Sequence, residues 1–337
     1  MAPTLAPMEA LLAAELPSGD GWQFEPKWDG FRTIARRDGD AVTLTSKSGK
    51  PLARYFPEVV EMLRSVRETS FTLDGELVIN VGDALAFDAL QMRLHPAESR
   101  IRKLSAETPA ELMAFDLLEL GGSSLLDDPL AQRRDKLERF LSKNAVDGLH
   151  LSPMTHDRDA ALGWLARSGG ALDGVIAKRT DQSYRAGERA VVKVKQQRTA
   201  DCVVGGFRYA EKRKEVGSLL LGLYDDGLLH HVGFTSALRA EDRPALTAKL
   251  EQLIKPPGFT GNAPGGPSRW ANARSAEWQP LAPKLVVEVR YDQVTARRFR
   301  HGTGLLRWRP DKSPQQCTFD QLAPELRPSE LKELFGT

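Results

Sequence analysis

The chain has 337 residues, a length that favours two domains over one. Hydrophobic residues make up 41% and charged residues 27%, which predicts a globular protein with real cores and excludes collagen, coiled coils and disorder. The net charge of +2 by itself predicts no polyanionic partner. Cys202 and Cys317 form no Cys-x-x-Cys pair, which excludes a sequence-spaced zinc site and a disulfide scaffold and favours a reducing compartment.

The first 198 residues alternate predicted helices and strands. A helix is predicted over Met8–Leu16, and Trp22–Asp29 alternates as a half-buried strand does. A hairpin is predicted from Phe31–Arg37 and Ala41–Ser46, because Asp38-Gly39-Asp40 between them is a turn signal. Further helices are predicted at Tyr55–Arg67, Leu130–Ser142 and Asp157–Arg167, and further strands at Phe71–Val81, Leu112–Leu120, Leu172–Lys178 and Ala190–Lys195, with two short helical segments between the first two of these strands.

The pattern turns polar at residues 196–200, so we place the domain boundary at 198, with domains over 1–198 and 199–337. The sequence of the second domain predicts short, closely spaced strands and one helix, which is typical of a small Greek-key barrel of the OB type. The fold class is therefore α+β. The strands are predicted at Cys202–Tyr209, Ser218–Tyr224, Leu228–Thr235, Leu285–Tyr291 and Leu305–Arg309, and the helix at Glu241–Ile254.

Dividing the charge at residue 198 shows a gradient that the total conceals. Residues 1–198 hold 27 basic and 29 acidic residues, and the remainder holds 20 and 16. Residues 284–312 alone hold eight basic and three acidic residues, interleaved with Tyr291, Phe299 and Trp308. A basic stretch with aromatic residues is a candidate nucleic-acid surface. The alternative is a solvated strand face whose arginines pair locally.

Two short motifs in the first domain carry candidate chemistry. In Lys27-Trp28-Asp29-Gly30-Phe31-Arg32 an amine and a carboxylate share one strand face, which is either a salt bridge or the setting of a nucleophilic lysine. Gly30 is expected to let the backbone turn. In Asp74-Gly75-Glu76 two carboxylates share one face, which suits Mg²⁺ if they are not simply a surface turn.

Three later segments add to this set. Phe115-Asp116 lies on an apolar strand, where Phe115 is either core or a stacking platform for a base. Asp173-Gly174-Val175-Ile176-Ala177-Lys178 supplies another carboxylate and another amine. Lys193 and Lys195 place two amines on one strand face, where they repel unless an anion lies between them, and this suggests phosphate.

In this order the segments resemble the nucleotidyltransferase motifs of the ATP-dependent DNA ligase superfamily, and the compact length is similar to bacterial ligases of the ligase C type. Two positions depart from the family pattern: Lys47 in Ser46-Lys47-Ser48-Gly49 stands where the family has arginine, and Asp173 stands where it has glutamate. The matching segments are the adenylated-lysine motif at 27–32, the third motif at 74–76, the adenine-stacking motif at 115–116, the fourth at 173–178, the fifth at 193–195 and the sixth at 307–312, which is Arg307-Trp308-Arg309-Pro310-Asp311-Lys312.

The resemblance implies an ATP-grasp-like nucleotidyltransferase domain of antiparallel sheets and helices, followed by an OB-fold barrel. It implies that Lys27 takes AMP from ATP, that AMP passes to the 5′-phosphate of a nick, and that the 3′-OH then displaces AMP. The expected catalytic residues are Lys27, Asp29, Lys193 and Lys195. The expected ATP-binding residues are Glu25, Lys27, Arg32, Glu76, Phe115, Lys178, Lys193, Lys195, Arg309 and Lys312, the metal ligands Glu76 and Asp173, and the DNA-binding residues Arg32, Lys47, Arg307 and Arg309.

The implied cofactors are ATP and Mg²⁺ or Mn²⁺. The implied partner is nicked duplex DNA, with separate repair polymerases or end-binding proteins, and the expected setting is a monomer at the nucleoid of a bacterial cytoplasm, away from membranes. DNA repair is the expected process. Two alternatives remain open on the residues alone: an RNA ligase or mRNA-capping guanylyltransferase, which shares the lysine motif, and a catalytically silent module that binds DNA ends.

Overall fold

The computed structural model describes residues 5–169, 171–211, 213–265, 277–295, 297–300, 302–322 and 326–335. The chain forms two compact units. The first contains the residues up to Gln196 together with those from Leu326 onward, and the second runs from Gln197 to Glu325. The division at residue 198 predicted from the sequence assigns the whole C-terminus to the second domain, whereas in the structure the chain returns to the first unit. No helix in the described ranges is long and apolar enough to cross a membrane.

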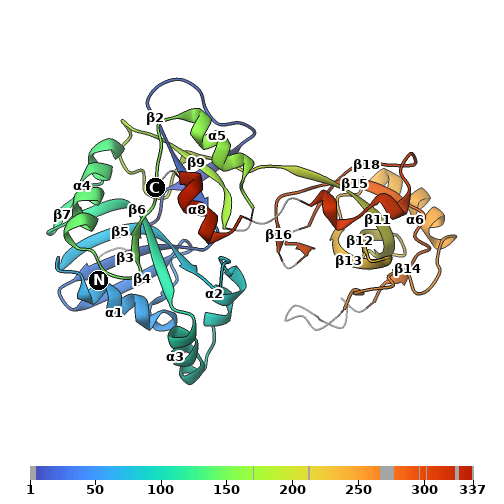
Figure 1. The fold of residues 1–337 in the computed structure, drawn as a ribbon, viewed down its shortest axis with the longest axis horizontal. Coiled ribbons are helices and arrows are strands. Elements are labelled where there is room, and N and C mark those ends of the chain that lie inside the picture. Colours follow the sequence, from blue (N-terminus) through green and yellow to red (C-terminus); the bar gives the residue numbers. More distant parts are fainter. Residues whose placement is uncertain are drawn as a thin grey trace. The chain divides into compact units, whose positions relative to one another are not determined.

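The first unit contains two sheets (Figure 1). The four-stranded sheet pairs β1 with β10 in parallel, and its other neighbours are antiparallel. The second sheet is antiparallel apart from the pairing of β8 with β6. In spatial order the first sheet is β1 (Glu9–Ala13), β10 (Arg189–Val194), β9 (Leu172–Arg179) and β2 (Trp22–Trp28), and the second is β4 (Ala41–Ser46), β3 (Phe31–Asp38), β5 (Ser70–Ile79), β6 (Ala110–Leu120) and β7 (Ser123–Ser124), with β8 (Leu149–Leu151) beside β6.

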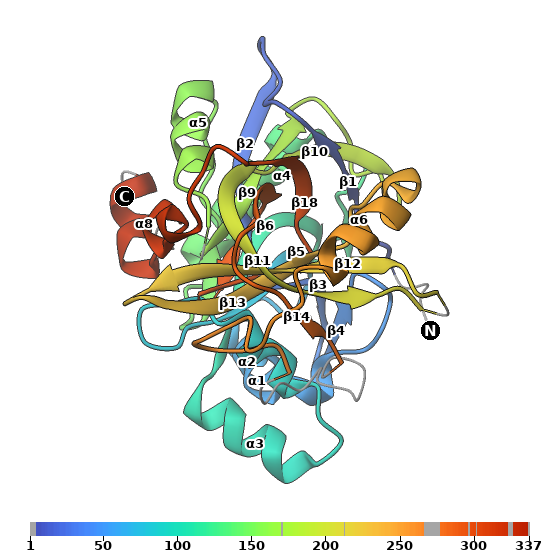
Figure 2. The same ribbon diagram turned by 90° about the vertical axis from the view of Figure 1, so that its right-hand side faces the viewer.

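Helices cover these sheets and close the core of the unit. Helix α1 (Pro57–Ser65) starts with a proline in its first turn and buries Val59, Val60 and Leu63 against the second sheet, as its helical spacing predicts. Helix α8 lies beside α5 in both views (Figures 1 and 2). The other helices are η1 (Ala53–Tyr55), α2 (Phe87–Arg93), α3 (Glu98–Glu107), α4 (Leu130–Lys143), α5 (Arg158–Ala166) and α8 (Pro328–Phe335).

The predicted helix over Met8–Leu16 is wrong, because this segment contains strand β1. Its backbone pairs with β10, and the Met8 N–H donates to the Tyr184 hydroxyl at 3.0 Å. Leu11 and Leu12 remain exposed, so local apolar spacing does not decide the structure here. Pairing with a strand about 180 residues away overrides the local helical preference. The predicted hairpin, by contrast, is confirmed as β3 and β4.

In its described residues, the second unit is a curled sheet with helix α6 (Arg243–Glu251) beside it (Figure 2). A bridge between Thr235 and Thr303, with the Thr235 hydroxyl donating to the Thr303 carbonyl, joins the two edges of the sheet into a barrel. The strand order is β13 (Leu228–Thr235), β12 (Val216–Asp225), β11 (Arg198–Tyr209), β15 (Val286–Tyr291) and β18 (Gly304–Trp308), with β14 (Gln279–Pro280) beside β11, a separate pair β16 (Val294–Thr295) and β17 (Arg298–Phe299), helix α6 (Arg243–Glu251), and the short helices η2 (Ala240–Asp242), η3 (Pro314–Gln316) and η4 (Phe319–Gln321).

Candidate active site

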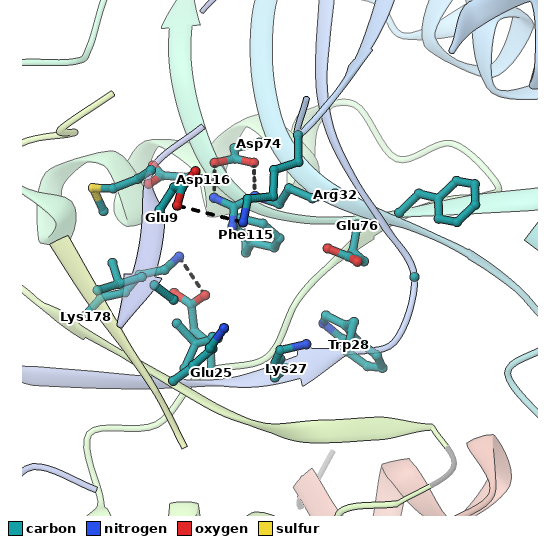
Figure 3. Close-up of a pocket in the computed structure, with 18 of the residues that line it drawn as sticks. Glu9, Glu25, Lys27, Trp28, Arg32, Asp74, Glu76, Phe115, Asp116 and Lys178 are labelled. Atoms are coloured by element: carbon teal, nitrogen blue, oxygen red, sulfur yellow. Dashed lines mark hydrogen bonds and ion pairs between the residues drawn. The ribbon is translucent and has the colours of Figure 1, made fainter. Parts of the chain in front are cut away.

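A pocket of about 620 Å³ in the first unit is lined by residues of both sheets (Figure 3). Most of the site residues that the sequence predicts in this unit face it, although they come from strands far apart in the chain. The predicted residues that line the pocket are Glu25, Lys27, Arg32, Lys47, Glu76, Phe115, Lys178 and Lys193.

Lys27 is held by a carboxylate from the neighbouring strand. Its Nζ donates to Asp173 Oδ2 at 2.5 Å, and the Lys195 Nζ lies 2.9 Å from the same oxygen. Burial raises the pKa of Asp173, but the two ammonium groups outweigh it, so the pKa is lowered and the carboxyl stays ionised. The burial of Lys193 and the charges of Lys27 and Lys195 lower the pKa of Lys193. One carboxylate therefore balances a cluster of amines around the predicted nucleophile.

Two glycines let the strands that carry these groups approach closely. A Cβ on Gly30 would lie 2.1 Å from the Leu77 carbonyl oxygen, and one on Gly174 would lie 2.2 Å from that of Val194. Gly174 also has a φ of +130°, which other residues rarely adopt. The backbone at Gly30 does not have a positive φ. The chain does bend at Asp29 and Gly30, between β2 and β3, as expected. The need for glycine there is steric, since strand β5 passes directly beside it.

Asp74 and Glu76 both face the pocket, as predicted, but they differ in their contacts. Asp74 accepts two hydrogen bonds from Arg32, each 2.6 Å long, and one from the Tyr184 hydroxyl at 2.7 Å. Across the described ranges, no side-chain or backbone group donates a hydrogen bond to the Glu76 carboxylate. Burial raises the pKa of Glu76 to about 7, although Lys27 and Arg32 oppose this. A cation beside Glu76 would relieve that cost.

These residues fit a magnesium ion bound together with a nucleotide. The described residues contain no cluster of three or more His, Cys, Asp or Glu side chains that could hold a metal by themselves. Mg²⁺ in phosphate-transfer sites is commonly held by one or two carboxylates, with phosphate and water completing its octahedron. Glu76, which faces the pocket with its oxygens free of hydrogen bonds in the described structure, has the chemistry of such a ligand.

One end of the pocket combines an aromatic ring with a buried ion pair. Glu25 lies 2.7 Å from Lys178, and their side chains are only 3% and 6% exposed. Gln23 donates to the other carboxylate oxygen of Glu25 at 2.7 Å. The Lys178 Nζ and the Arg32 guanidinium lie 4.6 Å and 4.8 Å from the centre of the Phe115 ring. A planar base with an amino group can stack on such a ring and donate to such a carboxylate.

The remaining predicted residues of the first unit lie at the edge of this arrangement. Lys47 lines the pocket next to Ser46 and Ser48, and its Nζ is 4.0 Å from Glu9. Asp29 follows β2 and is not among the lining residues, although its charge contributes to the raised pKa of Glu76. Glu9 and Tyr184 also line the pocket but were not predicted. Glu9 lies in a segment that was predicted as helix, and the Tyr184 hydroxyl faces the site by donating a hydrogen bond to Asp74.

The predicted residues of the second unit form an ion-pair cluster of their own. Asp201 accepts from Arg309 at 2.9 and 3.1 Å and from Lys312 at 2.7 Å. Arg309 also donates to Asp311 at 2.8 Å, and this contact lowers the pKa of Asp311 to about 2. Arg307 pairs with Glu288 at 2.6 Å. The alternative of local pairing therefore holds for these three cations of the basic stretch.

Two family models match the chain. The model of the ATP dependent DNA ligase domain matches residues 4–195, and that of the ATP dependent DNA ligase C terminal region matches residues 212–312. The chain belongs to the ATP-dependent DNA ligase family. The ligase therefore has an adenylation domain followed by an OB-like domain, as predicted, and it seals nicks in DNA through adenylate intermediates formed from ATP. This decides against the RNA ligase, capping-enzyme and silent-module alternatives.

Relatives of this ligase agree with that assignment over nearly its full length. It is 46% identical over 335 residues to DNA ligase C1 of Mycolicibacterium smegmatis, covering 95% of this chain and 94% of the relative. It is 40% identical to DNA ligase C of Mycobacterium tuberculosis, with the same coverage. Among solved structures, a Lig E DNA ligase shares the fold with a TM-score of 0.54 at 17% identity, covering 90% of this chain and all of that one.

Proposed function

We propose that Lys27 is the residue that carries AMP in this ligase. The observation that supports it is the position of the Lys27 amine, which faces the pocket and is held by Asp173 within a cluster of amines. The deprotonated Nζ attacks the α-phosphorus of ATP, the N–P bond forms, and the bond to the β-phosphate oxygen breaks so that pyrophosphate leaves with the electron pair. Lys193 and Lys195 stabilise the charge that develops on the phosphate.

The pocket of the first unit holds the adenosine part of ATP. Glu25 accepts from the adenine amino group and Phe115 stacks on the ring, while Arg32 contacts the ribose or the nick. Lys178 keeps Glu25 ionised and oriented through their buried ion pair. Arg309 and Lys312, already gathered by Asp201, bind the pyrophosphate portion of ATP.

Glu76 is the proposed ligand of Mg²⁺ or Mn²⁺, with Asp173 as a second carboxylate once Lys27 carries AMP and no longer pairs with it. The ion, when bound, neutralises phosphate charge and polarises the α-phosphorus. Lys47, Arg307 and Arg309 contact the DNA backbone around the nick as charge partners of phosphate. Lys47 does this as a point charge, since it lacks the two-pronged geometry of arginine.

We further propose that the ligase works as a monomer on nicked duplex DNA in bacterial DNA repair, with separate polymerases or end-binding proteins supplying the ends. The support is the likeness to bacterial ligase C enzymes over nearly the full length of the chain.

A test separates the role of Lys27 from the rest of the site. A fluorescent duplex with an ordinary nick is incubated with ATP, and a second duplex carries a nick that is already adenylated. We expect Lys27→Ala to lose sealing of the first duplex and to retain sealing of the second, because only the first needs AMP on the enzyme. The matched control Lys50→Ala, at an exposed lysine, retains both activities. Sealing of the ordinary nick by Lys27→Ala would overturn the assignment.

A further inference from the structure

The C-terminal segment of the chain, Leu326–Phe335, lies against the strands that carry the proposed catalytic groups. It follows the whole second unit in sequence but belongs to the first unit. It also lies beyond the two family models, the second of which ends at residue 312. No role assigned above to the adenylation domain or the OB-like domain therefore includes it.

Specific contacts fix this segment in place. Leu326 forms two backbone hydrogen bonds, from its N–H to the Gly169 carbonyl at 2.9 Å and from the Ala171 N–H to its own carbonyl at 3.0 Å. In the first turn of α8, the Ser329 N–H donates to Asp83 at 2.8 Å, and its hydroxyl donates to the other oxygen of that carboxylate. Backbone and side-chain bonds together define one docked position, which a purely apolar contact does not.

The apolar side of the segment meets residues adjacent to the catalytic groups. Leu326 is 4% exposed and packs in one cluster with Trp28, Leu172 and Val78. Trp28 is the neighbour of Lys27, Leu172 is the neighbour of Asp173, and Val78 lies two residues from Glu76 on β5. Trp28 and Leu172 are also paired across β2 and β9. The cluster thus supports both sides of the ion pair between Lys27 and Asp173.

Phe335, at the end of α8, completes the support of Trp28. Its ring centre lies 6.1 Å from that of Trp28 at 69° and 5.1 Å from that of Trp164 at 84°, both edge-to-face arrangements. The Trp28 indole N–H donates to the Ser152 hydroxyl at 2.9 Å. The indole is therefore fixed by a hydrogen bond and by an aromatic ring from the C-terminal helix.

We propose that Phe335 is a positioning residue for lysine adenylation, and that it acts through Trp28 to keep the Lys27 amine aligned with Asp173 and the α-phosphorus of ATP. The inference rests on the proposed role of Lys27. Attack by an amine on phosphorus needs near in-line geometry, and a displacement of about 1 Å can cost up to about a hundred-fold in rate. The step that joins the 3′-OH to an adenylated nick does not use Lys27 as a nucleophile, so it does not need this alignment.

The test measures transfer of label from α-labelled ATP to the full-length enzyme in a single turnover, alongside sealing of a pre-adenylated nick, well below the melting temperature. We expect Phe335→Ala to slow labelling at saturating ATP about ten-fold or more. The half-saturating ATP concentration and the sealing of the pre-adenylated nick stay within about two-fold. Phe335→Tyr, which keeps the ring, and Glu333→Ala, at an exposed position on the same helix, retain the rate of labelling.

Two outcomes overturn the inference. One is labelling of Phe335→Ala at the wild-type rate; the other is an equal fall of labelling and of sealing, because that is the signature of lost folded protein. Lys27→Ala is labelled in parallel. If it still accepts AMP, the proposed nucleophile is wrong, whereas loss of label in Lys27→Ala together with normal labelling of Phe335→Ala refutes the positioning role alone.

Discussion

His231 on β13 makes the second unit sensitive to acid. The side chain is buried, and the Arg298 guanidinium lies 3.2 Å from its Nδ1. Burial, with smaller contributions from Arg298 and Arg208, lowers the pKa of His231 from 6.5 to about 3. The folded unit therefore keeps this histidine neutral at a pH at which the unfolded chain protonates it.

The sign and size of the effect follow from this difference. Because the folded pKa is the lower one, the contribution to stability is complete above pH 6.5 and is lost as the pH falls from there toward 3. At pH 5 the pH lies about 1.5 units below the pKa of the histidine in the unfolded chain. Protonation of the unfolded chain therefore destabilises the second unit by about 2 kcal/mol relative to pH 7. The variant His231→Asn, whose amide oxygen can accept from Arg298, has no such group to titrate.

The assay is urea-dependent hydrogen exchange of peptides from β12 and β13, which reports the second unit alone. We expect the free energy of unfolding of the wild type to fall by about 2 kcal/mol more than that of His231→Asn between pH 7 and pH 5. The control His156→Asn, at an exposed position of the first unit, falls with the wild type. Equal pH dependence in wild type and His231→Asn would show that His231 is not the group whose protonation destabilises the unit.

Three further predictions concern the first unit. Arg133 and Asp116 form a buried ion pair with hydrogen bonds of 2.8 and 3.0 Å. Arg133→Met leaves the Asp116 charge buried without its partner, so it should lower the free energy of unfolding in urea titrations by about 3–5 kcal/mol. A loss below about 1 kcal/mol would contradict this. Glu25→Gln should raise the half-saturating ATP concentration for enzyme labelling about ten-fold or more, because a charged acceptor is lost; an unchanged value would remove Glu25 from the adenine site. EDTA should abolish labelling, and Glu76→Gln should need more Mg²⁺ than the wild type to restore it; equal requirements would exclude Glu76 as a ligand.

The sequence predicted most elements of both units because their signals are local. Apolar spacing places α1 and α4 within a few residues of their observed bounds, and the Asp-Gly turn predicts the β3–β4 hairpin. The short motifs likewise identified side chains that do line one pocket, such as Lys27 and Glu76. Local pattern is sufficient where a residue's role depends on its immediate neighbours.

What could not be predicted depends on contacts between distant segments. Strand β1 forms only because β10 is beside it, and nothing within residues 8–16 indicates that partner. The 2.5 Å contact between Lys27 and Asp173 joins residues 146 positions apart. Phe335 follows the whole second unit in the sequence, yet its ring contacts Trp28 of the first unit, and nothing in the local sequence indicates that contact. Tertiary geometry, which has no local signature, also sets the pairing of Arg309 with Asp201.

Locating the covalent AMP on the enzyme tests directly whether Lys27 is the nucleophile. Wild-type enzyme is incubated with ATP and Mg²⁺ without DNA, denatured and digested, and the adduct is mapped by mass spectrometry of the peptides. We expect AMP on Lys27 alone, and no adduct in Lys27→Ala. An adduct on Lys193 or Lys195, which belong to the same cluster of amines, would contradict it.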